Sequence, residues 1–132
     1  MTIAYWCVLA AALLPYAFVI ATGTPTKEGK ARWGVGYDNV EPRTYLDGLV
    51  GWRKRARAAE VNGYEAFPPF AAAVIIAHLS HGPSRTIDLL AAVFVAFRIV
   101  HGLLYVANQP TARSLVWFGG VGATIALFVV AA

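Results

Sequence analysis

Apolar residues in this chain fall into four long runs that are separated by shorter polar segments. Charged residues are absent from positions 1–26, 66–84 and 114–132. A helix that crosses a bilayer needs about 20 mostly apolar residues. The pattern therefore predicts four membrane-spanning helices, at about residues 3–22, 60–79, 86–107 and 114–131.

The four predicted helices occupy most of the 132 residues, so we expect one all-α domain, an integral membrane four-helix bundle. The composition agrees, because only 14% of the residues are charged and 58% are hydrophobic, whereas a soluble domain has roughly 25% charged residues. The first apolar run lacks a preceding basic segment and is longer than about 15 residues, which favours a membrane helix over a signal peptide.

Basic residues are concentrated between the first and second predicted helices. Eight of the eleven lysines and arginines lie there: Lys27, Lys30, Arg32, Arg43, Arg53, Lys54, Arg55 and Arg57. Loops rich in Lys and Arg stay in the cytoplasm, so we expect residues 23–57 to be cytoplasmic and both termini to lie outside. Topology and contact with anionic lipid explain the net charge of +4 without nucleic acid. We expect a bacterial inner-membrane protein.

Two of the predicted helices carry polar side chains along one face. Spacings of i, i+3, i+7 and of i, i+7, i+10 each place three residues on one side of a helix. The two sets are Arg98, His101 and Tyr105 in the third helix, and Arg55, Asn62 and Glu65 in the second.

Two opposite charges from these sets lie at one depth. With a rise of 1.5 Å per residue, Glu65 lies roughly 12 Å inward from Arg57, and Arg98 lies roughly 13 Å inward from Ala107 on the antiparallel helix. A charge in the hydrocarbon region costs at least about 2.5–3.5 kcal/mol. We therefore predict that Glu65 and Arg98 pair.

A buried ion pair that only orients two helices would need no polar neighbours. Asn62, His101, Tyr105 and Arg113 nevertheless fall in the same half of the bundle. Each has a structural explanation by itself; Arg113, for example, could be only a charge that sets topology. Together they favour a pocket for a polar or anionic ligand.

Other chemistries find little support in the sequence. Cys7 is the only cysteine, which excludes an intrachain disulfide and a cysteine metal site. The three histidines have no metal-ligand spacing, so no metal site is predicted. There are no paired carboxylates and no nucleophile motif, and a transporter is disfavoured because the helices show no inverted repeat.

The segment "NGYEAFPPF" at 62–70 resembles the second helix of the MAPEG superfamily, the membrane-associated proteins in eicosanoid and glutathione metabolism. That helix typically reads R-A-x-x-N-x-x-E-x-x-P-x-F, and Asn62, Glu65, Pro68 and Phe70 match it. The segment "RIVHGLLY" at 98–105 and the arginine at the start of the fourth helix are also similar to the family. The resemblance covers essentially the whole chain.

This resemblance implies a homotrimer that holds glutathione between neighbouring subunits on the cytoplasmic side. By that likeness Asn62 and Glu65 would hold the peptide, with Glu65 accepting from its amino group. Arg98 and Tyr105 would contact its carboxylates or backbone, with His101 beside them. Arg113 would be the catalytic residue, because a nearby cation lowers the pKa of a thiol and the thiolate is the nucleophile.

The chain departs from the family pattern at Ala58, where the family has an arginine that binds a carboxylate. Arg55, one turn earlier on the same face, could replace that cation only in part. Two hypotheses therefore stand. The first is a glutathione-dependent transferase or peroxidase-like protein that acts on lipophilic electrophiles. The second is a non-catalytic membrane protein that binds lipid or serves as an accessory subunit.

Overall fold

The computed structural model describes residues 1–22, 40 and 42–132, and the regular structure among them is entirely helical. Four helices are long and one is short. They are α1 (Ile3–Thr22), α2 (Pro42–Asp47), α3 (Gly51–Leu79), α4 (Ser84–Val106) and α5 (Pro110–Ala131). The prediction of an all-α bundle of four long helices is confirmed.

Three of the described helices are long and apolar enough to cross a membrane: α1 over Ile3–Ile20, α4 and α5. An integral membrane protein is therefore confirmed. The helix α3 is not among the three, because its apolar second half begins with Asn62 and Glu65 and contains two prolines. The fourth span, over about residues 60–79, remains a prediction.

Two helices begin earlier than the charge pattern predicted. The helix α3 starts at Gly51 rather than near residue 60, because the Arg and Lys residues that follow are good helix formers. Gly51 has a φ of 62°, which glycine adopts without steric cost at the turn that leads into the helix. The helix α5 starts at Pro110 rather than near residue 114, since proline suits the first helical position.

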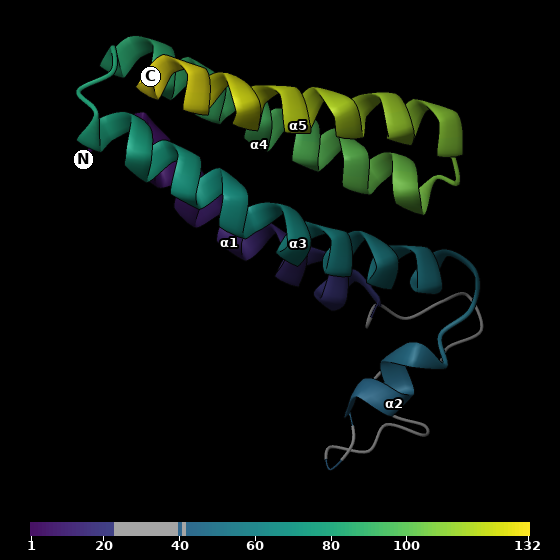
Figure 1. Ribbon diagram of the computed structural model, residues 1–132. Helices are drawn as coiled ribbons and strands as arrows, with labels where there is room; N and C mark the ends of the chain where they lie inside the picture. The colour runs from purple at the N-terminus through teal and green to yellow at the C-terminus, as the bar shows by residue number, and fades with distance from the viewer. Residues whose placement is uncertain (23–39, 41) are drawn as a thin grey trace.

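The long helices form two antiparallel pairs (Figure 1). The helices α4 and α5 pack closely together, as do α1 and α3, and the pairs meet through contacts of α4 with α1 and α3 and of α3 with α5. Both termini lie at one end of the bundle, together with the turn between α3 and α4. The turn between α4 and α5 lies at the other end, the end that also carries α2.

The core between α1, α3 and α4 is built mainly from small residues. Small side chains let membrane helices approach closely, and the buried alanines are Ala4, Ala11, Ala73, Ala77 and Ala91. Phe70 of α3 stacks on Phe94 of α4 with ring centroids 3.8 Å apart. Gly63 of α3 faces Pro15 of α1 so closely that a Cβ there would lie 2.8 Å from the proline ring.

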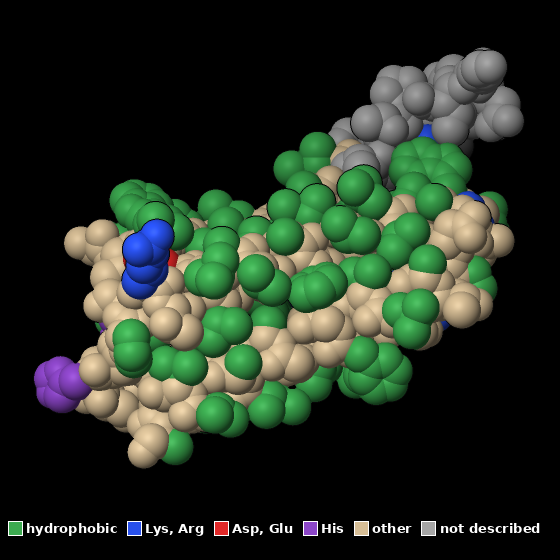
Figure 2. Space-filling view, turned by 90° about the horizontal axis from the view of Figure 1, so that it is seen from above, with side chains coloured by type: hydrophobic (Ala, Val, Ile, Leu, Met, Phe, Trp, Pro, Cys, Tyr) green, Lys and Arg blue, Asp and Glu red, His purple; other side chains and the backbone are tan. Residues whose placement is uncertain are grey.

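The outer surface of the bundle is apolar, as a lipid environment requires. In Figure 2, hydrophobic side chains cover the visible face from end to end, while Lys and Arg side chains lie near its two ends. Exposed large apolar residues occur on each membrane-spanning helix, for example Leu13, Leu103 and Val129.

Polar contacts join α1 and the residue before it to α3 and α4 at the end of the bundle where both termini lie. The backbone N–H of Ala4 donates to Asp88 Oδ1 at 2.7 Å, which satisfies a donor at the start of α1. The ring of His78 lies 3.0 Å from the Thr2 hydroxyl and 2.8 Å from the Val74 carbonyl. Tyr5 stacks on the same ring, so His78 serves to join α1 to α3.

Candidate functional site

The polar side chains predicted on α4 lie on its inward face. Arg98 and His101 are buried, with 6% and 2% of their surface exposed, and Tyr105 follows one turn after His101. Because α4 is helical throughout Ser84–Val106, the spacing of three and four residues aligns the three side chains. They lie in the half of α4 that leads to its turn into α5.

Asn62 connects Arg98 to Glu65. Arg98 Nη2 donates to Asn62 Oδ1 at 2.8 Å, and Asn62 Nδ2 donates to Glu65 Oε2 at 3.4 Å. The amide therefore accepts from the cation and donates to the carboxylate, the arrangement that suits both charges.

The prediction that Glu65 and Arg98 form an ion pair is wrong for the described residues. The ion pair found there joins Arg57 Nη1 to Glu60 Oε2 at 2.7 Å. The physical reason is that Glu65 lies on the exposed face of α3. Arg98 is buried in the bundle and meets α3 at Asn62 instead. The two side chains are bridged by the amide and do not come within ion-pair distance of each other.

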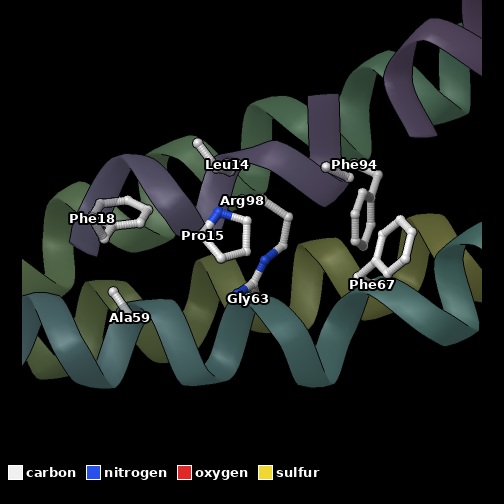
Figure 3. A pocket seen from close by; sticks show the side chains of 9 residues that line it. Leu14, Pro15, Phe18, Ala59, Gly63, Phe67, Phe94 and Arg98 are labelled. Carbon is white, nitrogen blue, oxygen red and sulfur yellow. The ribbon is translucent and has the colours of Figure 1, made fainter. Parts of the chain in front are cut away.

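The side chain of Arg98 passes through the centre of the bundle (Figure 3). It points toward Gly63 of α3 and lies near Pro15 of α1. The two residues line, with Arg98, a small cavity of about 10 Å³, a volume close to the minimum for one water molecule. The missing N–H of Pro15 leaves the Ala11 carbonyl in the same cavity without its helical donor, so the arginine lies in a partly polar site.

Arg113, Tyr105 and His101 contact one another in sequence at the border between α4 and α5. The Arg113 guanidinium carbon lies 4.2 Å from the Tyr105 ring centroid, a cation–π contact. Tyr105 meets His101 edge to face, with centroids 5.5 Å apart. Arg113 belongs to the first turn of α5, where the helix dipole disfavours a cation. Its position therefore does not serve helix stability.

His101 has a ring nitrogen without a hydrogen bond. Its Nδ1 atom is buried and has no hydrogen-bond partner among the described residues, although buried polar atoms nearly always have one.

A hollow of about 260 Å³ opens beside these side chains, and we call it the polar hollow. It is lined by Asn62, His101, Tyr105, Arg113, Ser114, Trp117 and Phe118. Four of the predicted site residues thus meet there, and Arg98 reaches the hollow through Asn62. Its volume is slightly below the roughly 300–1,000 Å³ usual for small-molecule pockets.

Sequence reasoning missed Ser114, Trp117 and Phe118. The signal was present but depended on where α5 begins. With a start near residue 114, Arg113 lies outside the helix and has no neighbour at i+4. With the observed start at Pro110, Trp117 stands one turn after Arg113 on the same face.

Two other predicted site residues lie outside the polar hollow. Arg55 Nε donates to the Val106 carbonyl at 3.0 Å and so satisfies an acceptor at the end of α4. Glu65 lines a second hollow of about 670 Å³ beside α2, together with Arg43, Leu46, Arg57, Glu60, Val61 and Tyr64. We call it the α2 hollow.

A third hollow, the apolar hollow, lies deeper between α3, α4 and α5. It has a volume of about 300 Å³ and is lined by Ala66, Pro69, Phe94, Arg98, Trp117, Gly120, Val121, Thr124, Ile125 and Phe128. Trp117 also lines the polar hollow. One aromatic side chain therefore forms a wall between a polar and an apolar space.

Among the described residues no cluster of three or more His, Cys, Asp or Glu side chains is suited to a metal ion.

The contact of Asn62 with Arg98 should matter more for stability than its contact with Glu65. We expect Asn62→Leu to lower the free energy of unfolding by about 1–3 kcal/mol, because it removes a partner from a buried charge. Glu65→Gln should cost less, since Glu65 is exposed and its contact is longer. Unfolding in mixed detergent measures both, and equal losses would contradict the assignment.

Comparison with protein families identifies a match to the MAPEG family over residues 3–132. Neither the curated proteins nor the solved structures compared with the chain include a significant match. The family match covers essentially the whole chain, including each helix that lines the three hollows. The chain therefore belongs to the MAPEG family, which supports in general terms a membrane-bound, glutathione-related transferase or peroxidase-like role.

Proposed function

We propose that this protein is a membrane enzyme that uses glutathione to attack lipophilic electrophiles, in the manner of a transferase or peroxidase. The observation that carries the proposal is the polar hollow, where Arg113, Tyr105, His101 and Asn62 converge. His101, which lines this hollow, also has a buried Nδ1 atom without a partner among the described residues, a feature that is rare in native proteins and sometimes reflects a catalytic role.

The polar groups of the hollow match the chemistry of a thiol peptide. Glutathione carries carboxylates, peptide groups and an ammonium group. Arg113 offers a cation for the thiolate, and Tyr105 offers a hydroxyl for the carboxylates or carbonyl groups. Glu65 is the carboxylate for the ammonium group, and Asn62 holds it in place at 3.4 Å. Arg98, whose guanidinium is bound to Asn62, would position that amide.

Arg113 is proposed to stabilise the thiolate. A nearby cation lowers the pKa of a thiol from about 8.5, and the thiolate is the reactive species. The cation–π contact with Tyr105 holds the guanidinium in place before the ligand arrives. In the transferase reaction the thiol gives its proton to water, the sulfur forms a bond to the electrophilic carbon, and the leaving group departs with the bonding electron pair.

The apolar hollow supports a lipophilic second substrate. Apart from Arg98 and Thr124, its lining consists of apolar side chains and Gly120, and Phe128 and Ile125 are also exposed on the outer surface. A molecule dissolved in the membrane could therefore enter it directly. Because Trp117 lines both hollows, such a molecule would meet the thiolate at this side chain.

We also propose that the protein is a homotrimer assembled around α3. The exposed face of α3 carries residues at alternating spacings of four and three, the pattern of a left-handed coiled coil. These residues are Val61, Glu65, Pro68, Ala72, Ile75 and Leu79. Symmetric assembly around this row would enclose Glu65 between subunits. Residues of a neighbouring subunit would also enlarge the polar hollow, which is small for a tripeptide.

A second candidate function is binding without catalysis. It is favoured by Ala58, which leaves the family's carboxylate-binding cation missing, and by Arg55, whose Nε is bound to the Val106 carbonyl. In this case the apolar hollow would hold a lipid chain. A calorimetric titration of the purified protein with glutathione decides between the two functions, because only the first requires saturable binding.

The catalytic role of Arg113 predicts a specific kinetic pattern. We expect Arg113→Ala to lower kcat by about 100-fold or more, as loss of a preorganised charge does, with little change in glutathione affinity. That pattern marks an interaction made mainly in the transition state. Conjugation of a model electrophile and the ultraviolet absorbance of the bound thiolate are the measurements.

Arg85→Ala is the matched control, since Arg85 lies at the start of α4, at the opposite end of the bundle. It should leave kcat and the thiolate signal unchanged. Full activity of both Arg113→Ala and Arg113→Lys would show that Arg113 serves only as a topological charge.

The proposed topology places both termini and Pro83 outside the cytoplasm. In a Cys7→Ser background, we expect Pro83→Cys to react with a membrane-impermeant thiol reagent in intact bacterial cells. Gly48→Cys, beside the basic segment, should react only after lysis, because positive segments stay inside. The reverse labelling pattern would refute this orientation.

The proposed trimer predicts cross-linking across the exposed face of α3. In the same Cys7→Ser background, Ala72→Cys should form disulfide-linked dimers in membranes on mild oxidation, because symmetry brings identical positions together. Ala92→Cys is the matched control, since Ala92 is exposed on α4. Efficient cross-linking at position 92 and none at position 72 would exclude this interface.

A further inference from the structure

The exposed face of α3 divides the polar hollow from the α2 hollow. At 3.6 residues per turn, Asn62 lies about 60° to one side of Glu65, whereas Tyr64 lies about 100° to the other. Asn62 lines the polar hollow, and Tyr64 lines the α2 hollow with Glu60. Since 60, 62 and 64 are adjacent in one helix, both hollows lie at the same depth.

The α2 hollow contains a cation that has no partner among the described residues. Arg57 is bound to Glu60 at 2.7 Å, and Glu65 accepts from Asn62. Arg43, from the short helix α2, is exposed and has no hydrogen bond or ion pair with the other described residues. Among the described residues that line this hollow, its guanidinium is therefore the positive charge that is available to a ligand.

Threefold assembly around α3 brings unlike flanks together. In a ring of copies each contact is heterologous, so that one flank of a subunit faces the opposite flank of the next. With the exposed row of α3 at the centre, the polar hollow of one copy faces the α2 hollow of its neighbour. The membrane normal is the symmetry axis, so hollows at one depth meet.

We propose that Arg43 of the neighbouring copy supplies the carboxylate-binding cation that is missing at Ala58. The inference rests on the proposed use of glutathione and on the proposed trimer. Glutathione would lie across the boundary, with its thiol beside Arg113 of one copy and a carboxylate on Arg43 of the next. Arginine suits this role because its planar fork binds a carboxylate through two parallel hydrogen bonds.

Removal of Arg43 should weaken glutathione binding and spare the chemical step. We expect Arg43→Gln to raise the Kd and KM for glutathione by roughly 10- to 100-fold, the loss of one or two charge-assisted hydrogen bonds, with kcat nearly unchanged. Arg43→Lys should recover part of the affinity. Arg43 is exposed, so thermal unfolding of the variants should match that of the wild-type protein.

Mixed trimers test whether Arg43 acts on its own subunit or on the next. Arg113→Ala and Arg43→Gln subunits, each inactive at low glutathione, are co-expressed with different tags, and trimers that carry both tags are isolated. If Arg43 acts across the boundary, some boundaries combine an intact Arg113 with an intact Arg43. Each isolated trimer that carries both tags then has one such boundary out of three, so about a third of wild-type activity is restored.

Three results would overturn the inference. Mixed trimers without recovered activity would place both residues in one subunit. Unchanged glutathione affinity in Arg43→Gln, or a loss found only in Arg57→Gln, would remove Arg43 from the site. Wild-type protein that binds no glutathione would instead refute the proposed function itself, and this inference with it.

Discussion

The arrangement of this protein depends on how it accommodates one guanidinium group inside an apolar bundle. Arg98 is 6% exposed and lies among helices whose other inward residues are mostly small or aromatic. An unpaired charge there would be costly, and the hydrogen bond to Asn62 at 2.8 Å compensates for part of this cost. That bond fixes α3 against α4, and the polar hollow lies beside it.

The sequence predicted the fold well because membrane helices are specified by long-range composition. Runs without charge locate the spans, and α1 agrees with its predicted bounds. The errors lie at the ends of helices, where basic residues continue α3 back to Gly51 and Pro110 starts α5 early. The positions of charged residues predict where a helix leaves the membrane. Helix propensity and proline geometry determine where the helix itself begins, and this residue can lie outside the membrane.

The candidate site was predictable only in part. Helical periodicity was sufficient to place Arg98, His101 and Tyr105 on one face. Depth along the axis suggested a direct pair between Glu65 and Arg98, but depth says nothing about the angle around each helix. Asn62 occupies the angle between them and carries the contact. The position of Trp117 in the site could be recognised only from the observed start of α5. The proposed role of Arg43 could be recognised only from the tertiary placement of α2.

The shared wall at Trp117 has a consequence for how a reaction at this site would be quantified. In the proposed reaction the polar hollow would take its solute from water, so the bulk concentration of that solute would govern its occupancy. The apolar hollow would take its solute from lipid, where the governing quantity is the mole fraction in the membrane. Added lipid or detergent that carries no substrate would dilute the second partner without affecting the first. The rate would therefore follow surface dilution, and an apparent KM for a lipophilic partner would have meaning only per amount of bilayer.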